Sequence, residues 1–535
     1  MSINISEGVV NAPGSQWNAL GPGGIVNNGT TNINPTYNLV TQPAPVGPQP
    51  IDILREQACA GAAFDSAERG DPPRCHPETR TAVLSSGRKW ADTFNTLCLF
   101  MWITGWAGVG KSAILQTLAE LYSKSGRLAA SFFFFQASHN RNSTSGFVAT
   151  IAEQLMDSVP GAREIILDKI AKNPQIFVNK SFQSQWETLI VNTLCHPTVR
   201  RPVAPMLIVI DGVDEIASHD EQRILLQTIL STAPQLGPSY KFLFASRPEQ
   251  QLERVFKEFG IRQESRIELG NGSGTQADIG LFLEASFSEI RYAYDFQSTS
   301  STQAWPGQNV IKQLVNKASG QFVYASTVIR FVGSQDDPQA ALDLIIKGRD
   351  VHAEAVKELD SLYLVLMKRV EGSIEKKNQH VLHHLLVCIY MHLVSKVGDE
   401  HHLLHPGASK SLLKTLLGKL EPILGTNGEY RHKSFIEFLI QPSAPHIFSI
   451  NSWHISGVIS LCLPVFLGNH EDKRSLLCFL ERASPTPDLV SCLSEMPEGE
   501  LSSWDHKVGC KKSGYLWDDK WRLGWLRCQF FQMSE

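Results

Sequence analysis

The chain has 535 residues, a formal net charge of −4 and a sequence pI near 6.5. Its apolar content of 42% and charged content of 19% are those of a globular protein, and the length allows about two to four domains. The near-neutral charge gives no sign of a nucleic-acid-binding surface, so we expect no nucleic-acid partner. Ten cysteines without a C-x-x-C pair argue against a zinc ribbon or a disulfide framework.

We expect neither a secretory leader nor a membrane segment. The first basic residue is Arg55, so a leader with a basic start is not expected. The longest apolar stretches, near residues 98–104 and 455–467, are shorter than a helix that spans a bilayer. We therefore expect a cytoplasmic protein without a membrane span.

Residues 1–50 are predicted to be a disordered segment. They are rich in Asn, Gly and Pro and contain one charged residue, Glu7, so they offer little apolar surface to bury. A short hairpin around Asn28-Gly29 is the alternative for part of this segment.

Residues 51–96 are predicted to be a helical lead-in, with helices over 51–67 and 79–93. From residue 97 to 270 strand and helix patterns alternate regularly. Such alternation predicts an α/β fold with a parallel sheet that helices flank on both faces. In these sheets ligands bind at the carboxyl ends of the strands.

The segment from Cys98 to Ser112 carries the most specific motif of the chain. It reads CLFMWITGWAGVGKS, which is an apolar strand, the pattern G-x-x-x-x-G-K-[ST] and the start of an amphipathic helix. The glycines let backbone N–H groups surround a phosphate at the positive end of the new helix. The predicted nucleotide-binding residues are Gly105, Trp106, Ala107, Gly108, Val109, Gly110, Lys111 and Ser112.

The loop and the next buried strand predict a metal site. Lys111 would reach the β- and γ-phosphates, and the hydroxyl of Ser112 would bind Mg²⁺. The apolar strand over 206–210 ends at Asp211. We expect its carboxylate to hold the same ion through water, because Mg²⁺ keeps several of its waters. The metal site is thus predicted at Ser112 and Asp211.

Two further acids follow Asp211 closely. Asp214 and Glu215 complete the sequence DGVDE, and one of them is predicted to polarise the attacking water as a general base. Three carboxylates this close repel one another unless a cation lies among them. The cluster therefore favours catalysis over a purely structural nucleotide site.

An arginine ends another predicted strand. Arg247 directly follows the strand over 241–246, where a guanidinium is predicted to touch the γ-phosphate. The alternative is a surface arginine that pairs with Glu249 or Glu253.

Beyond the flexible segment 270–274 the sequence is predominantly helical. Helices are predicted over residues 276–293, 308–331, 339–346, 353–370, 378–394 and 409–420. Residues 446–535 show only a weak helical pattern, and the tail from about residue 500 has no pattern that we can interpret.

These motifs together resemble the NACHT family of STAND NTPases, particularly the form common in fungal NLR-like proteins. The loop at 105–112 is similar to its Walker A motif, the acids at 211–215 resemble its extended Walker B motif, and Arg247 matches its sensor-1 arginine. The block CHPETR at 75–80 and the helical segment 314–331 are similar to segments that flank the NTPase domain in this family. We expect the base pocket to involve the segment before the P-loop, Arg74 to Arg80, without a single residue assigned to the base.

The segment RHKSF at 431–435 resembles the winged-helix segment of the family, in which a histidine binds the β-phosphate of ADP and latches the closed state. The resemblance implies that His432 is a nucleotide-binding residue. It also implies an NTPase domain at 97–270, a helical domain at 275–375 and a winged-helix-like domain at 376–445.

The resemblance implies a slow NTPase that acts as a switch, with Mg²⁺ and ATP or ADP as ligands and GTP or GDP as the open alternative. Exchange of ADP for ATP would open the chain for self-association, in fungal innate immunity or heterokaryon-type recognition, with protein partners that the sequence does not name. Two other functions stay open. One is a P-loop kinase-like enzyme that acts on a small molecule, and the other is an interaction scaffold with a structural nucleotide or none.

Overall fold

A computed structural model places the chain in two units, residues 1–49 and 50–535. The residues that it describes are 18–20, 24–26, 48–94, 98–136, 138–260, 265–270, 272–294, 305–347, 358–376, 379–395, 410–424, 433–440, 448–450, 454–455, 457–459 and 489. The predicted hairpin at Asn28-Gly29, the predicted latch His432 and the tail from residue 500 lie outside the described residues.

The described part of the first unit is a short antiparallel pair. Strands β1 (Asn18–Leu20) and β2 (Gly24–Val26) face each other with Ala19 opposite Ile25.

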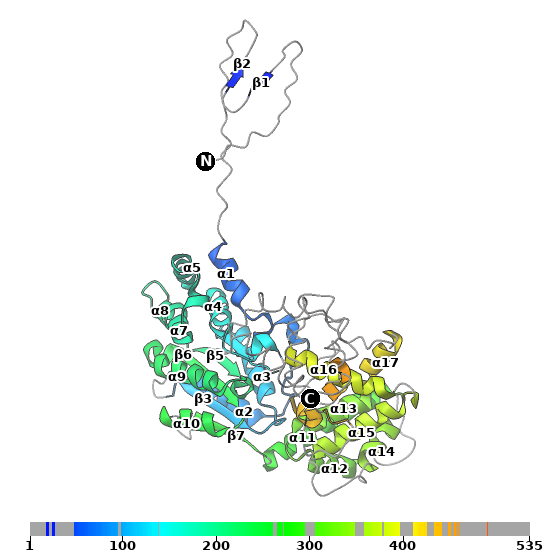
Figure 1. Ribbon diagram of the computed structural model, residues 1–535. Helices are drawn as coiled ribbons and strands as arrows, with labels where there is room; N and C mark the ends of the chain where they lie inside the picture. Colours follow the sequence, from blue (N-terminus) through cyan, green and yellow to red (C-terminus); the bar gives the residue numbers. More distant parts are fainter. Residues whose placement is uncertain are drawn as a thin grey trace, which may run out of the picture. The chain divides into compact units, whose positions relative to one another are not determined.

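The second unit contains a five-stranded sheet (Figure 1). Its strands are β3 (Phe100–Gly105), β4 (Leu128–Phe133), β5 (Met206–Asp211), β6 (Tyr240–Ser246) and β7 (Arg266–Leu269). The strand order is β4-β5-β6-β3-β7, and each neighbouring pair is parallel. The predicted α/β fold with a parallel sheet is confirmed. Strand β6 lies between β3, which leads into the P-loop, and β5, which ends at Asp211.

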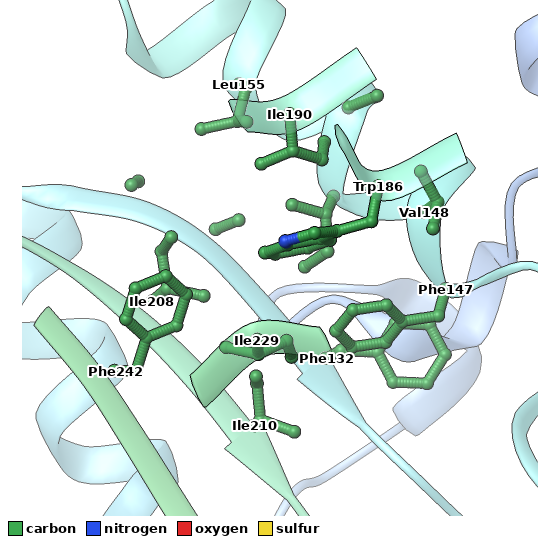
Figure 2. Packing of buried hydrophobic residues seen from close by; sticks show 14 of the residues in the cluster. Phe132, Phe147, Val148, Leu155, Trp186, Ile190, Ile208, Ile210, Ile229 and Phe242 are labelled. Carbon is green, nitrogen blue, oxygen red and sulfur yellow. The ribbon is translucent and has the colours of Figure 1, made fainter. Parts of the chain in front are cut away.

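One face of the sheet packs against a group of helices, and together they form a hydrophobic core. They are α1 (Pro50–Gln57), α4 (Phe147–Ser158), α5 (Ala162–Lys172), α6 (Ile176–Asn179), α7 (Phe182–Trp186), α8 (Asn192–Leu194), α9 (His219–Leu236) and α10 (Gln250–Glu258). Figure 2 shows Trp186 packed among aliphatic and aromatic side chains of this core. Its buried Nε1–H donates to Thr232 Oγ1 at 2.9 Å, which satisfies the polar atom of the indole.

The opposite face packs against α2 (Thr81–Asp92) and α3 (Lys111–Lys124). Successive side chains of a strand point to opposite faces, so Trp102 joins the first core whereas Met101 and Ile103 join this one. Burial on both faces explains why the strands read as continuous apolar runs in the sequence.

The later helices form a separate core, coloured green to orange in Figure 1. They are α11 (Ser273–Ala293), α12 (Gln308–Ala318), α13 (Phe322–Gly333), α14 (Pro338–Lys347), α15 (Glu358–Gly372), α16 (Gln379–Ser395), α17 (Lys410–Leu420) and α18 (Lys433–Ile440).

Within the described part of the chain, no helix combines the length and the apolarity needed to cross a bilayer.

Two predicted helices differ from the observed ones. The helix expected over 308–331 is divided between α12 and α13, because Ser319 and Gly320 adopt left-handed backbone angles of φ +47° and +83°. The helix expected over 51–67 ends at Gln57. There the N–H of Cys59 donates to the Thr150 hydroxyl on α4 at 2.8 Å, so a tertiary contact replaces the next helical bond.

Candidate nucleotide-binding site

The loop between β3 and α3 has a backbone that requires glycine. Gly108 and Gly110 have φ values of +78° and +95°, in the region that side chains disfavour. A Cβ atom at Gly105 would lie 2.8 Å from the carbonyl oxygen of Leu269 on β7. Helix α3 begins at Lys111 without a side-chain cap, so its positive end points at the loop. This is the geometry of an anion-binding loop.

The lysine of the motif folds back over the loop. Lys111 Nζ donates to the carbonyl of Gly105 at 2.7 Å and to that of Trp106 at 3.1 Å. The indole of Trp106 is 69% exposed, so this residue joins the loop through its backbone.

The electrostatic surroundings of Lys111 identify its neighbours. Burial lowers the pKa of the ammonium, the carboxylates of Asp214, Asp211 and Glu215 raise it, and the guanidinium of Arg247 lowers it. Such effects act over short distances. Strands β5, β6 and β3 are parallel neighbours, so their carboxyl ends place the predicted acids, Arg247 and the loop with Lys111 at one edge of the sheet.

Asp211 is buried at the end of β5, with 4% of its surface exposed. Burial raises its pKa to about 6, although a hydrogen bond with the Ser112 side chain and the charge of Lys111 act in the opposite direction. Among the described residues, its Oδ1 atom has no hydrogen-bond partner. A hard cation bound by this oxygen and the Ser112 hydroxyl would relieve the desolvation, so the donor set fits Mg²⁺.

Arg247 is oriented by Asp214. The backbone N–H of Arg247 donates to Asp214 Oδ1 at 3.0 Å, and its Nε lies 3.3 Å from Asp214 Oδ2. The alternative pairing with Glu253 is not formed, because Glu253 pairs with Arg266 at 3.0 Å. The side chain of Arg247 is 20% exposed and lies against Asp214, at the carboxyl end of the sheet.

Glu215, which with Asp214 is a candidate for the general base, has a different environment from Asp214. Glu215 is half-buried and accepts the backbone N–H of Gln136 at 3.0 Å, from the loop that follows β4. Its carboxylate therefore lies at the edge of the acid cluster, whereas that of Asp214 is engaged with a guanidinium.

A buried arginine before the P-loop forms hydrogen bonds with the loop and with a later helix. Arg80 is 6% exposed, and its guanidinium donates to the Val109 carbonyl at 2.7 Å and to Thr275 Oγ1 at 2.9 Å. It also lies 4.0 Å from an Asp278 carboxylate oxygen and stacks over the ring of Phe322. Arg80 therefore connects the P-loop to α11 and α13.

The segment from Arg74 to Arg80 is the one expected to contribute to a base pocket. Arg74, its first residue, is exposed and pairs with Glu120 at 2.7 Å and with Asp71 at 3.0 Å. Nothing in the local sequence distinguishes this surface arginine from the buried Arg80.

Helix α13 touches the loop itself. The N–H of Val323 donates to the Gly108 carbonyl at 3.1 Å, and a Cβ on Gly108 would lie 2.4 Å from Val323 Cγ1. A side chain at position 108 would thus collide with the first turn of α13.

Helix α18 adds an acid that the sequence analysis did not single out. Glu437 Oε1 lies 2.8 Å from Arg247 Nη2. His432, which the resemblance assigns to the nucleotide, lies outside the described residues, which begin again at Lys433. Arg247 therefore contacts carboxylates from two distant parts of the chain.

The family described as "Nephrocystin 3, N-terminal" matches residues 79–247, which is less than half of the chain. This stretch contains the P-loop, the acids at 211–215 and Arg247. A comparison with curated proteins finds no match.

Solved structures give weak similarities. Cdc6p from Pyrobaculum aerophilum is 13% identical, with a TM-score of 0.33, over 66% of this chain and 89% of that one. Drosophila ORC bound to DNA is 11% identical, with a TM-score of 0.30, over 73% and 88%. The Aeropyrum pernix ORC2 protein in ADPNP and ADP complexes is 11% identical, with a TM-score of 0.28, over 70% and 87%. The assignment of a P-loop NTPase fold therefore depends on the parallel sheet and the glycine loop of this chain, and not on these similarities.

Proposed function

We propose that this chain is a nucleotide-controlled switch of the NACHT type, which binds ATP or ADP with Mg²⁺ and hydrolyses ATP slowly. The observation that carries the proposal is the position of Lys111, Ser112, Asp211 and Arg247 at the carboxyl ends of three neighbouring parallel strands. GTP and GDP remain the alternative ligands, because no residue of the described chain identifies a base.

Each residue has a distinct proposed role. The N–H groups of the loop and the Lys111 ammonium bind the β- and γ-phosphates, displacing the carbonyl contacts that Lys111 now makes. Ser112 and Asp211 hold Mg²⁺, which neutralises charge on the phosphates when bound. Glu215 or Asp214 polarises the attacking water, and Arg247 binds the terminal phosphate.

The proposed switch uses the contacts of the later helices with the site. Helix α13 binds the loop through Val323, and α18 binds Arg247 through Glu437, so a ligand that moves either group alters the fit of these helices. His432 is proposed to bind the β-phosphate of ADP and to close the chain. Opening would expose a surface for self-association, in the fungal recognition role that the sequence resemblance implies.

The nucleotide content of the purified protein tests this proposal. Denaturation and ion-exchange chromatography should release about one ADP per wild-type chain and none from Lys111→Ala, because the loop loses its phosphate cation. The matched control is Lys124→Ala, at the exposed last turn of the same helix, which should keep its nucleotide. His432→Ala should lose ADP if the histidine closes the site.

Other outcomes would replace the proposal. Wild-type protein that is empty and does not bind added nucleotide would contradict a nucleotide switch and leave the scaffold function. Rapid turnover that depends on a small-molecule phosphate acceptor would indicate the kinase-like function.

A further inference from the structure

The guanidinium of Arg247 lies between two carboxylates, one from Asp214 after β5 and one from Glu437 on α18. Its Nε lies 3.3 Å from Asp214 and its Nη2 lies 2.8 Å from Glu437. Burial by itself would lower the pKa of Arg247, but Glu437 and then Asp214 outweigh it and hold the pKa above its usual value. The guanidinium is therefore charged and already paired on two sides.

The two carboxylates differ in how firmly they are held. The side chain of Asp214 is 3% exposed and also accepts the backbone N–H of Arg247, so it belongs to the fixed frame of the sheet. The side chain of Glu437 is 40% exposed and reaches Arg247 from α18. Because Glu437 is the more exposed of the two carboxylates and comes from a helix outside the sheet, the contact with Glu437 is the one that a competing anion can displace.

A terminal phosphate is such an anion. It carries more charge than a carboxylate and offers several oxygens to the planar guanidinium. A nucleoside diphosphate lacks this group, so it leaves the Nη2 of Arg247 to Glu437.

Resting on the proposed function, we infer that Glu437 competes with the terminal phosphate of a nucleoside triphosphate for Arg247, so that triphosphate binding releases α18 and diphosphate binding does not. The contact thus distinguishes the two nucleotides, because only the triphosphate has a terminal phosphate that binds Arg247 in place of Glu437.

Helix α18 would transmit this change to a neighbouring helix. The hydroxyls of Ser434 and Tyr363 lie 2.9 Å apart, and Phe435 and Phe438 pack their rings on Tyr363 of α15. These contacts are buried, so α18 and α15 respond together when Glu437 is displaced.

The experiment compares binding of ATPγS and ADP to full-length wild type and Glu437→Gln. The amide keeps the size of the side chain and removes its charge. We expect ATPγS affinity to rise about tenfold, within the usual range of coupling between sites, while ADP affinity stays unchanged. The matched control is Glu258→Gln, an exposed acid at the end of α10, which should change neither affinity.

A double-mutant cycle shows whether the effect passes through Arg247. In an Arg247→Ala background, Glu437→Gln should leave the ratio of the two affinities unchanged. An unchanged ratio in the single variant, or an equal shift of both affinities, would overturn the inference.

Hydrogen exchange of the wild-type chain gives a test that needs no variant. Amides of α18 should exchange faster with ATPγS than with ADP. Equal protection with both nucleotides bound would overturn the inference and leave the proposed function intact. A wild-type chain that binds neither nucleotide would overturn both.

Discussion

Asp211 is a buried carboxylate, and its burial destabilises the folded protein when no cation is bound. A buried carboxylate is stabilised by protonation, which is why its pKa rises from 3.8 to about 6. The folded chain then keeps a proton that the unfolded chain releases between these two values. The free energy of unfolding is therefore expected to fall as the pH rises through this interval and to be constant above it.

We predict that Asp211→Asn removes this pH dependence. One pKa unit corresponds to ~1.4 kcal/mol, so this group should lower wild-type stability by ~1–3 kcal/mol between about pH 4 and pH 7. Urea unfolding in chelator, without nucleotide, measures this loss. It should shrink in Asp211→Asn and persist in the control Asp65→Asn, which alters an exposed acid. A variant with the wild-type pH slope would contradict the assigned pKa.

Arg80 shows that a single buried side chain can hold two distant segments of the chain together. Its guanidinium joins a P-loop carbonyl to a hydroxyl on α11, 195 residues away in sequence. A buried guanidinium is stable only with such partners. The positions of the loop and of the later helices are therefore coupled at this residue.

At the scale of elements, the order of the strands arranges the chemistry. Because β6 lies between β3 and β5, its end brings Arg247 between the P-loop and the acids. Helix α13 begins against the loop, so the loop contacts both the sheet and the later helices. Movement of either neighbour must change the shape of the phosphate site.

The contact between the loop and α13 predicts the effect of Gly108→Ala. The new methyl would lie 2.4 Å from Val323 Cγ1, and the backbone has φ +78°. We expect a loss of ~1–3 kcal/mol from overpacking in addition to backbone strain, together with weaker nucleotide binding. Urea unfolding and titration with a fluorescent nucleotide measure the two effects.

Gly126→Ala is the matched control for this substitution. Gly126 has φ +66°, but a Cβ there would meet nothing within 4 Å, so only backbone strain remains. Nucleotide affinity should therefore stay at the wild-type value. Adding Val323→Ala to Gly108→Ala should recover part of the loss, and equal effects at the two glycines would contradict the steric explanation.

At the scale of the whole molecule, two helical segments reach the site from outside the sheet. Helix α13 contacts the loop and α18 contacts Arg247, and both belong to the core of the later helices. A ligand between the sheet and these helices can therefore shift a population of closed and open chains, in proportion to its preference for one of them.

We predict that the oligomeric state follows the nucleotide. Sedimentation velocity should show a smaller species with ADP and a larger one with ATPγS, because the proposed opening would expose a surface for self-association. Lys111→Ala should show the same species with either nucleotide, and Lys124→Ala should behave as the wild type. Identical sedimentation of the wild type with both nucleotides would exclude nucleotide-controlled assembly.

The sequence by itself determined the loop, the strands beside it and the class of fold. The P-loop is readable because its chemistry needs consecutive residues: glycines for the turn, then a lysine and a serine at the start of a helix. The buried parallel strands are readable because burial on both faces makes them continuous apolar runs. The short β7 was missed, since only Leu269 of its four residues is buried.

Only the tertiary structure decided which residues from distant segments meet. The apolar runs of the strands look alike, so their pattern does not fix the order that places β6 between β3 and β5. An isolated arginine or glutamate carries no sequence signal for its partner, because a long-range ion pair depends on how the elements pack. The contacts of Arg80 with Thr275 and of Arg247 with Glu437 are therefore properties of the fold.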